Sequence, residues 1–336
     1  MPRIHVIVIV VGFVYLIWRC YYFQQLLAMC EDFQQSQLEH QEINPLVKIV
    51  ERAPSRSQVS HCTREDGDMC VPPLYTYATK YRIAEKNRLI ACAVEKNFST
   101  MLTAILCYLF DERRFLESKR NLTTEVYHQR FCASKNEYSS LTEIEAKVTS
   151  SLHDWQKIAV VRDPLEKFAS GFADKCLREQ TWKKFPNRCN KCKTNLKCFM
   201  ERQYARLLKR ATGVHSPVNF DDDHFSPQNW RCEFSTHLHD FQILHFDSSR
   251  PSGFTDSLLA VLKKNNVTER AMHFIKSSIE SKRTSHSTKD TVEHNETRRA
   301  ILSNPHLLDL LIRMYYYDYV LFGYRIPAVQ TETNKQ

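Results

Sequence analysis

The sequence predicts an α/β fold in which a P-loop-like parallel sheet is flanked by helices. Residues 89–94 (LIACAV) form a short apolar run of the kind that is buried on both faces of a parallel sheet. Residues 101–110 (MLTAILCYLF) follow as an almost wholly apolar segment, long enough for a buried helix. Residues 157–161 (KIAVV) repeat the strand pattern, and a further predicted helix follows them. This alternation of strand and helix is typical of the α/β class.

A polar loop, residues 95–100 (EKNFST), joins the first strand to its helix. A strand, a short loop and a helix together present backbone N–H groups and the positive end of the helix dipole to an anion. The ammonium group of Lys96 could reach that anion, and Ser99 and Thr100 add hydroxyl donors. The glycine-rich signature of nucleotide triphosphate hydrolases is missing, and the chain has only 6 glycines. A solvated turn is the alternative interpretation.

The second strand ends in a run with strong helix-start signals. Asp163 suits the N-cap position, Pro164 the first helical position, and Glu166 completes a capping box. Ser170 lies off the apolar stripe of the predicted helix, so packing does not explain it. Arg162 ends the strand, where open α/β sheets bind ligands, and its guanidinium suits a terminal phosphate.

Further elements are predicted along the rest of the chain from apolar periodicity and caps. One strand is expected at residues 241–246. Helices are expected at residues 199–211, 252–264 and 267–281, and a last helix from Asn304-Pro305 onward. Residues 218–234, rich in acids and aromatics, are interpreted as a loop over the site.

The two strand–loop–helix stretches resemble the donor-binding motifs of the sulfotransferases. EKNFST resembles the 5′-phosphosulfate loop, and VVRDPLEKFASGFADK resembles the 3′-phosphate motif in the form used by Golgi carbohydrate sulfotransferases. The nearest group is that of the chondroitin 4-O-sulfotransferases and HNK-1 sulfotransferases, in a divergent invertebrate branch. The positions that fit the second motif are Arg162, Asp163, Pro164, Glu166, Ser170, Asp174 and Lys175. Weaker likeness at residues 223–232 and 317–324 extends the resemblance to residues 85–326.

The first motif departs from the family pattern at three positions. The family usually has proline before the lysine, where this chain has Glu95, and small residues after it, where this chain has Asn97 and Phe98. A luminal glycan-binding protein that kept a sulfotransferase fold but lost activity is therefore an alternative function. A nucleotide kinase is disfavoured by the missing glycine loop.

The resemblance implies the sulfotransferase fold and a carbohydrate O-sulfotransferase. Such an enzyme moves a sulfuryl group from 3′-phosphoadenosine 5′-phosphosulfate to a glycan hydroxyl, on a chondroitin-like or another glycoprotein or proteoglycan sugar, and requires no metal. The phosphosulfate end is assigned to Lys96, Ser99 and Thr100, with the backbone N–H groups of Asn97 and Phe98. The 3′-phosphate is assigned to Arg162 and Ser170.

Two residues are candidates for the catalytic step. Lys96 is the candidate for neutralising charge on the departing oxygen. His224 is the candidate general base, because a neutral histidine accepts a proton near pH 7 and a carboxylate of the run Asp221-Asp222-Asp223 could orient its ring. The same acids are expected to raise its pKa. A surface histidine paired with an acid is the simpler interpretation, and the alternatives for the base are His215, His237, His245 or a glutamate.

The net charge of the chain indicates which class of partner it binds. The net charge of +9 suits a polyanion, and the absence of RNA-binding, zinc-finger and zipper signatures argues against nucleic acid.

Of 12 cysteines, Cys92 and Cys107 lie in the predicted core strand and helix and are expected to be free thiols. Disulfides are expected among Cys62, Cys70, Cys132, Cys176, Cys189, Cys192, Cys198 and Cys232. Zinc at Cys189, Cys192 and Cys198 is the alternative.

The N-terminus carries a membrane signal. Residues 4–18 are almost entirely apolar, and residues 1–23 are interpreted as a short basic tip and a type II signal anchor. A cleaved signal peptide and a secreted protein are the alternative. Residues 24–68 are interpreted as a luminal stem, 69–328 as the catalytic domain and 329–336 as a polar tail. The expected location is the Golgi membrane, with the catalytic domain in the lumen.

Sequons support a luminal location. Asn121, Asn266 and Asn295 each begin an N-x-[ST] pattern and are open to glycosylation. Asn97 also begins one, but it lies in the proposed donor loop, where a sugar would block the cofactor. We therefore expect Asn97 to remain unmodified.

Overall fold

A five-stranded mixed sheet organises the part of the chain that the structure describes, with the strand order β3-β1-β2-β4-β5. The computed structural model describes residues 62, 70–125, 129–213, 219–248, 250–281 and 291–328, all within the compact unit 59–336. The expected anchor, tail and nearly all of the expected stem lie outside these residues. Within them, no helix is long and apolar enough to cross a membrane.

The sheet is only partly parallel, so the prediction of a parallel sheet is corrected. The strands are β1 Tyr81–Ala84, β2 Leu89–Cys92, β3 Glu137–Tyr138, β4 Gln156–Arg162 and β5 Phe241–Phe246. β2, β4 and β5 run parallel, whereas β1 pairs antiparallel with both β2 and β3. Only the short turn Glu85–Asn87 and Arg88 link β1 to β2, and so short a connection can join only antiparallel strands.

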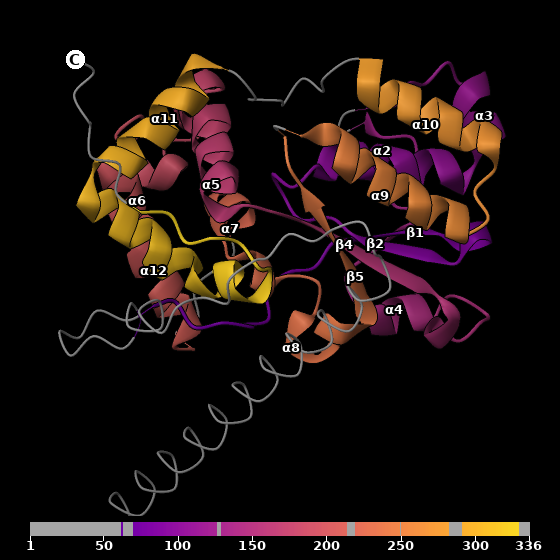
Figure 1. Cartoon of the computed structure of the whole chain (residues 1–336), viewed down its shortest axis with the longest axis horizontal. Coiled ribbons are helices and arrows are strands. Elements are labelled where there is room, and N and C mark those ends of the chain that lie inside the picture. Colours follow the sequence, from indigo (N-terminus) through magenta and orange to yellow (C-terminus); the bar gives the residue numbers. More distant parts are fainter. Residues whose placement is uncertain are drawn as a thin grey trace, which may run out of the picture. The chain divides into compact units, whose positions relative to one another are not determined.

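One group of helices packs with the sheet around a single apolar cluster. It consists of α2 (Ser99–Phe110), α9 (Pro251–Lys264) and α10 (Glu269–Ser281), which lie along the same side of the sheet (Figure 1). The short helices α3 (Glu112–Glu117), α4 (Leu141–Glu145) and α8 (Phe234–His237) complete this part. The predicted strand at 241–246 and the two predicted helices after it are confirmed.

A second group of helices surrounds a separate apolar cluster (Figure 1). Its members are α5 (Pro164–Phe172), α6 (Leu196–Ala211), α7 (Phe220–Phe225), α11 (Val292–Ser303) and α12 (Pro305–Leu321). α5 continues into a π-helical segment, Ala173–Arg178. A Cβ atom at Gly171 would lie 2.8 Å from Cε1 of Phe225, so this glycine allows α7 to approach α5 closely. The predicted start of α12 is confirmed, with the Asn304 side chain as its N-cap.

Residues 219–234 are folded, whereas a loop was predicted for 218–234 from its composition. Asn219 caps α7 by accepting a hydrogen bond from the N–H of Asp222 at 2.9 Å. A short 3-10 helix, Gln228–Trp230, follows, and all three of its residues are buried. Asp222, Gln228 and Asn229 do not force this stretch to the surface because their side chains form hydrogen bonds inside the protein.

Five disulfides cross-link the described residues: Cys62–Cys70, Cys92–Cys232, Cys107–Cys132, Cys176–Cys189 and Cys192–Cys198. The prediction that Cys92 and Cys107 are free thiols is therefore wrong. Their core location was predicted correctly, but the partner of Cys92 is 140 residues away and only the tertiary fold brings it close. The zinc alternative is also excluded at Cys189, Cys192 and Cys198, because each is bonded to another sulfur and supplies no thiolate.

Candidate active site

The loop between β2 and α2 has an unusual backbone for a sequence without glycine. Lys96 has φ 70° and Phe98 has φ 64°, both in the left-handed region that non-glycine residues rarely adopt. No side chain caps the first turn of α2. Its backbone N–H groups and dipole are therefore directed at the space before the helix, as in an anion-binding helix start.

Two side chains hold this loop in place. Asn97 is fully buried, and its side-chain amide donates to the carbonyl of Val160 at 3.0 Å and to Oε1 of Gln228. The ring of Phe98 packs against Phe246 and Phe254, with ring centroids 5.4 and 4.9 Å apart. These contacts offset the cost of the left-handed backbone and give Asn97 and Phe98, two of the three departures from the family pattern, a structural role.

One expected donor of this loop is already engaged. The backbone N–H of Asn97 donates to the carbonyl of Val94 at 3.2 Å. Asn97 thus does not offer this N–H to an anion as the sequence predicted. Ser99 and Thr100, by contrast, open α2 as predicted.

The Lys96 side chain points to the π-helical end of α5. Its Nζ forms an ion pair with the carboxylate of Asp174, which also lies 2.9 Å from Nζ of Lys175. Burial lowers the pKa of Lys96 to about 8, although Asp174 opposes this shift. The pKa of Asp174 is lowered as well, because the two lysines outweigh its burial. Asp174 belongs to the second sequence motif, but its contact with Lys96 was not predicted.

Arg162, at the end of β4, contacts the same loop. Its Nη1 donates to the carbonyl of Lys96 at 3.2 Å, and its Nη2 donates to Oγ of Ser248 at 3.3 Å. Its buried Nε has no hydrogen-bond partner among the described residues. The structure thus brings Arg162 and Lys96 together, with one donor of the guanidinium directed at no protein acceptor within the described part.

The predicted helix start at Asp163 is confirmed, but only half of the capping box forms. The Asp163 carboxylate accepts from the N–H of Glu166 at 3.1 Å. The Glu166 carboxylate instead contacts α11, through Nε of Arg298 at 2.8 Å and Nε2 of His294 at 3.2 Å. Ser170 lies further along α5, buried.

His224 is partly buried on α7. Its Nδ1 lies 2.7 Å from the carbonyl of Phe220, so the tautomer with a proton on Nδ1 donates to that carbonyl. Burial first, and then the charge of Lys96, lower the pKa of His224 to about 3. The predicted rise in this pKa is therefore wrong.

The three acids before His224 orient other groups. Asp221 accepts from the backbone N–H groups of Cys189 and Asn190, at 3.0 and 2.9 Å. Asp222 pairs with Arg206 and Arg210 of α6. Asp223 lies 3.4 Å from Nζ of Lys80 and 3.7 Å from Nη2 of Arg231. Backbone, rather than the predicted carboxylate, thus contacts the His224 ring.

Gln228 joins the elements of the site and was missed by sequence reasoning. Its Oε1 accepts from Asn97 and from the N–H of Arg162, and its Nε2 donates to the carbonyl of Arg162 at 2.8 Å. Asp318 of α12 accepts from the Gln228 N–H at 2.8 Å. Gln228 and Asp318 belong to the two segments, 223–232 and 317–324, in which the sequence showed a weaker resemblance. The structure shows that these segments contact each other.

Lys167 supports the His224 segment from α5. Its Nζ donates to the carbonyls of His224 and Ser226, each at 3.1 Å, and burial lowers its pKa to about 8. Among the described residues no group of histidine, cysteine and acidic side chains could hold a metal ion.

A strand–loop–helix with a buried lysine, an arginine of β4 packed against the loop and a neutral histidine nearby is the arrangement expected of an enzyme that transfers an anionic group. Similarity to known protein sequences specifies the class further. The model of the sulfotransferase family matches residues 79–325, so the chain belongs to this family and is a sulfotransferase.

Two relatives from Caenorhabditis elegans illustrate the similarity. The carbohydrate sulfotransferase chst-1 is 32% identical over 265 residues, which cover 77% of this chain and 79% of the relative. The protein vep-2, named provisionally as a sulfotransferase, is 31% identical over 255 residues, which cover 74% and 78%. No solved structure matches this chain significantly.

Proposed function

We propose that this protein is a carbohydrate O-sulfotransferase that uses 3′-phosphoadenosine 5′-phosphosulfate as donor and a glycan hydroxyl as acceptor. The observation that carries the proposal is the buried Lys96 in an uncapped strand–loop–helix, with the Arg162 guanidinium against the same loop. The similarity to a carbohydrate sulfotransferase supports the acceptor class.

The residues present fit such a donor. The first turn of α2 and Ser99 and Thr100 offer hydrogen-bond donors to the phosphosulfate end. The buried Nε of Arg162 is a guanidinium donor with no acceptor among the described residues, as expected of a group that receives a phosphate. Ser170 remains our assignment for the same 3′-phosphate.

Lys96 would neutralise the charge that develops on the oxygen that leaves the sulfur. Its pKa of about 8 keeps most of the side chain protonated at neutral pH. Because the site is buried, a positive charge there stabilises a transition state more than it would in water. Asp174 would hold the ammonium in place until the donor binds.

His224 would accept the proton of the acceptor hydroxyl as that oxygen bonds to sulfur. With Nδ1 directed at the Phe220 carbonyl, Nε2 carries the lone pair that accepts the proton. The low pKa keeps the ring neutral throughout the physiological range. General base catalysis is most efficient when the pKa lies near the operating pH, so with a pKa of about 3 His224 is a weak base.

The acceptor and the location belong to the proposal too. We propose a chondroitin-like or related glycoprotein or proteoglycan sugar as acceptor. We also propose a type II anchor in the Golgi membrane with the enzyme domain in the lumen. The five disulfides agree with an oxidising compartment.

The test is transfer of labelled sulfate by the full-length protein to a panel of desulfated glycans. We expect labelled glycan from the parent and a loss on the order of 10²–10³ in turnover for Lys96→Ala. Retention on an adenosine 3′,5′-bisphosphate column separates donor binding from transfer. A parent protein that neither binds this column nor labels any glycan would contradict the proposal.

A further inference from the structure

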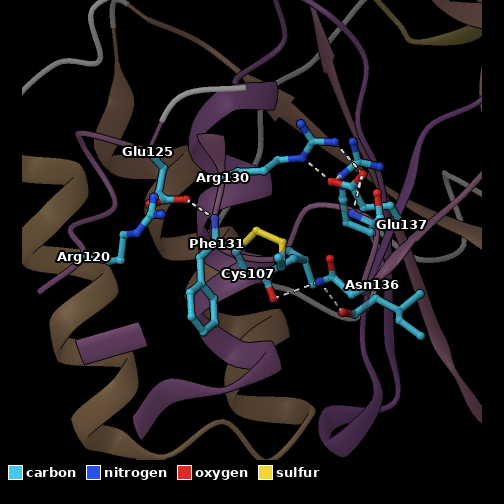
Figure 2. Close-up of a disulfide and its surroundings, with 12 residues drawn as sticks. Cys107, Arg120, Glu125, Arg130, Phe131, Asn136 and Glu137 are labelled. Carbon is cyan, nitrogen blue, oxygen red and sulfur yellow. Dashed lines mark hydrogen bonds and ion pairs between the residues drawn. A yellow bond between two sulfur atoms is a disulfide. The ribbon is translucent and has the colours of Figure 1, made fainter. Parts of the chain in front are cut away.

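Arg162 is only 5% exposed, yet among the described residues no carboxylate bonds directly to its guanidinium. The Glu166 carboxylate lies 4.0 Å from its Nη2 and contacts two side chains of α11 instead. Arg130, by contrast, donates through Nε and Nη2 to the Glu137 carboxylate (Figure 2). Because a buried cation without such a partner is costly, Arg162 is suited to an anion that comes from outside the chain.

Tyr324, three residues after the end of α12, carries a second buried hydrogen-bond donor. Its hydroxyl oxygen is buried and has no hydrogen-bond partner within the described part of the chain, as is also true of Nε of Arg162. A buried polar group that stays unpaired costs free energy, so such groups are rare in folded proteins. A ligand that accepts a hydrogen bond from this hydroxyl would remove that cost.

The C-terminal end of α12 fixes the backbone of Tyr324. Gly323 has φ +65°, and its N–H donates to the carbonyl of Val320 at 3.4 Å. The N–H of Tyr324 donates to the carbonyl of Tyr319 at 2.9 Å. The two bonds form a Schellman motif, in which a glycine reverses the chain because it adopts the left-handed backbone without strain. The position of Tyr324 is therefore set by the helix end.

Strand β5 brings Tyr324 to the end of the sheet that carries Arg162. The rings of His245 and Tyr324 pack edge to face with centroids 5.4 Å apart, and Nε2 of His245 lies 2.9 Å from the carbonyl of Phe322. β5 pairs with β4 as far as Arg162. Burial and the charge of Asp163 raise the pKa of Tyr324, and the charge of Arg162 opposes this rise. The phenol and the guanidinium thus lie within electrostatic range of each other.

We propose that the hydroxyl of Tyr324, together with Nε of Arg162, donates a hydrogen bond to the 3′-phosphate of the bound nucleotide. The inference rests on the proposed function, which supplies this nucleotide and assigns Arg162 to its 3′-phosphate. A phosphate oxygen is a strong acceptor, and one phosphate would satisfy both groups that the described residues leave unpaired. The raised pKa of Tyr324 keeps the phenol protonated, so that its hydroxyl is able to donate.

The experiment measures the affinity of the full-length protein for adenosine 3′,5′-bisphosphate and for adenosine 5′-monophosphate by calorimetry. Tyr324→Phe removes only the hydroxyl group. The matched control is Tyr138→Phe, a half-buried tyrosine of β3 at the opposite edge of the sheet from β5. We expect Tyr324→Phe to bind the bisphosphate about tenfold more weakly and the monophosphate as the parent does, because a hydrogen bond to a charged group is lost. Tyr138→Phe should bind both as the parent does.

Two further measurements separate this role from a structural one. Tyr324→Phe should unfold at the same temperature as the parent or at a higher one, because the hydroxyl has no partner among the described residues. In sulfate transfer, KM for the donor should rise while kcat is kept, since the 3′-phosphate is remote from the reacting sulfur.

Two outcomes would overturn the inference: an unchanged preference for the bisphosphate over the monophosphate in Tyr324→Phe, or equal weakening of both nucleotides. Failure of the proposed function looks different. In that case the parent itself shows no preference for the bisphosphate and transfers no sulfate.

Discussion

Nζ of Lys96 forms an ion pair with the carboxylate of Asp174, which joins the loop before α2 to the π-helical end of α5. Both side chains are largely buried, so the pair is shielded from solvent. Asp174 stabilises the charged form of the lysine, and burial opposes it. The protonation of Lys96, and with it the proposed transfer, therefore depends on Asp174.

The first prediction concerns the alkaline side of the pH profile. In the free enzyme, Lys96 loses its proton as the pH rises through about 8, so kcat/KM should fall above that pH. Asp174→Asn removes a negative charge that raises this pKa, so the fall should begin at lower pH. The exposed Asp154→Asn is the control and should keep the parent profile. If the pH profile of Asp174→Asn is the same as that of the parent, the protonation of Lys96 does not control the rate.

Donor binding should depend on Arg162. We expect Arg162→Ala to weaken the affinity for adenosine 3′,5′-bisphosphate about 10- to 100-fold, because a charged hydrogen bond is lost. Ser170→Ala should act in the same direction. Titration with adenosine 5′-monophosphate, which lacks the 3′-phosphate, is the comparison. Equal weakening of both ligands would mean that Arg162 acts through its bond to the Lys96 carbonyl instead.

His224→Asn should abolish most turnover while donor binding is kept. The ring stays neutral well below neutral pH because its pKa is about 3, so protonation of His224 should not reduce activity between pH 7 and 5. Turnover measured against pH in parent and variant checks both statements. Retained activity with the parent profile would exclude His224 as the base.

Asn97 should carry no glycan, although it begins a sequon. The residue is fully buried and its side chain is hydrogen-bonded, whereas Asn121, Asn266 and Asn295 are exposed. Peptide mass spectrometry of the secreted or membrane-bound protein tests this prediction directly. A glycan at Asn97 would contradict the folded loop.

Asn97→Ala should also lower the free energy of unfolding by about 1–3 kcal/mol, because the buried partners of the amide are left unsatisfied.

The sequence by itself determined the elements that carry the donor motifs. Apolar runs and caps are local signals, and they located β4, β5 and the N-cap Asp163 within a residue or two. The same local signals placed Lys96 between a buried strand and a buried helix. A motif of this kind can be predicted from the sequence because its strand, loop and helix are consecutive in the chain.

Only the tertiary structure decided which residues meet. The partner of Cys92 is 140 residues away, and Gln228 reaches Asn97 across 131 positions. The acids beside His224 are drawn to Arg206, Arg210, Lys80 and backbone N–H groups, because burial makes an unpaired carboxylate costly and these donors are within reach. Such pairings depend on how distant elements pack, which no local pattern records. Sequence thus determined the chemistry that each segment carries, and packing determined the partners that give each group its pKa and its position.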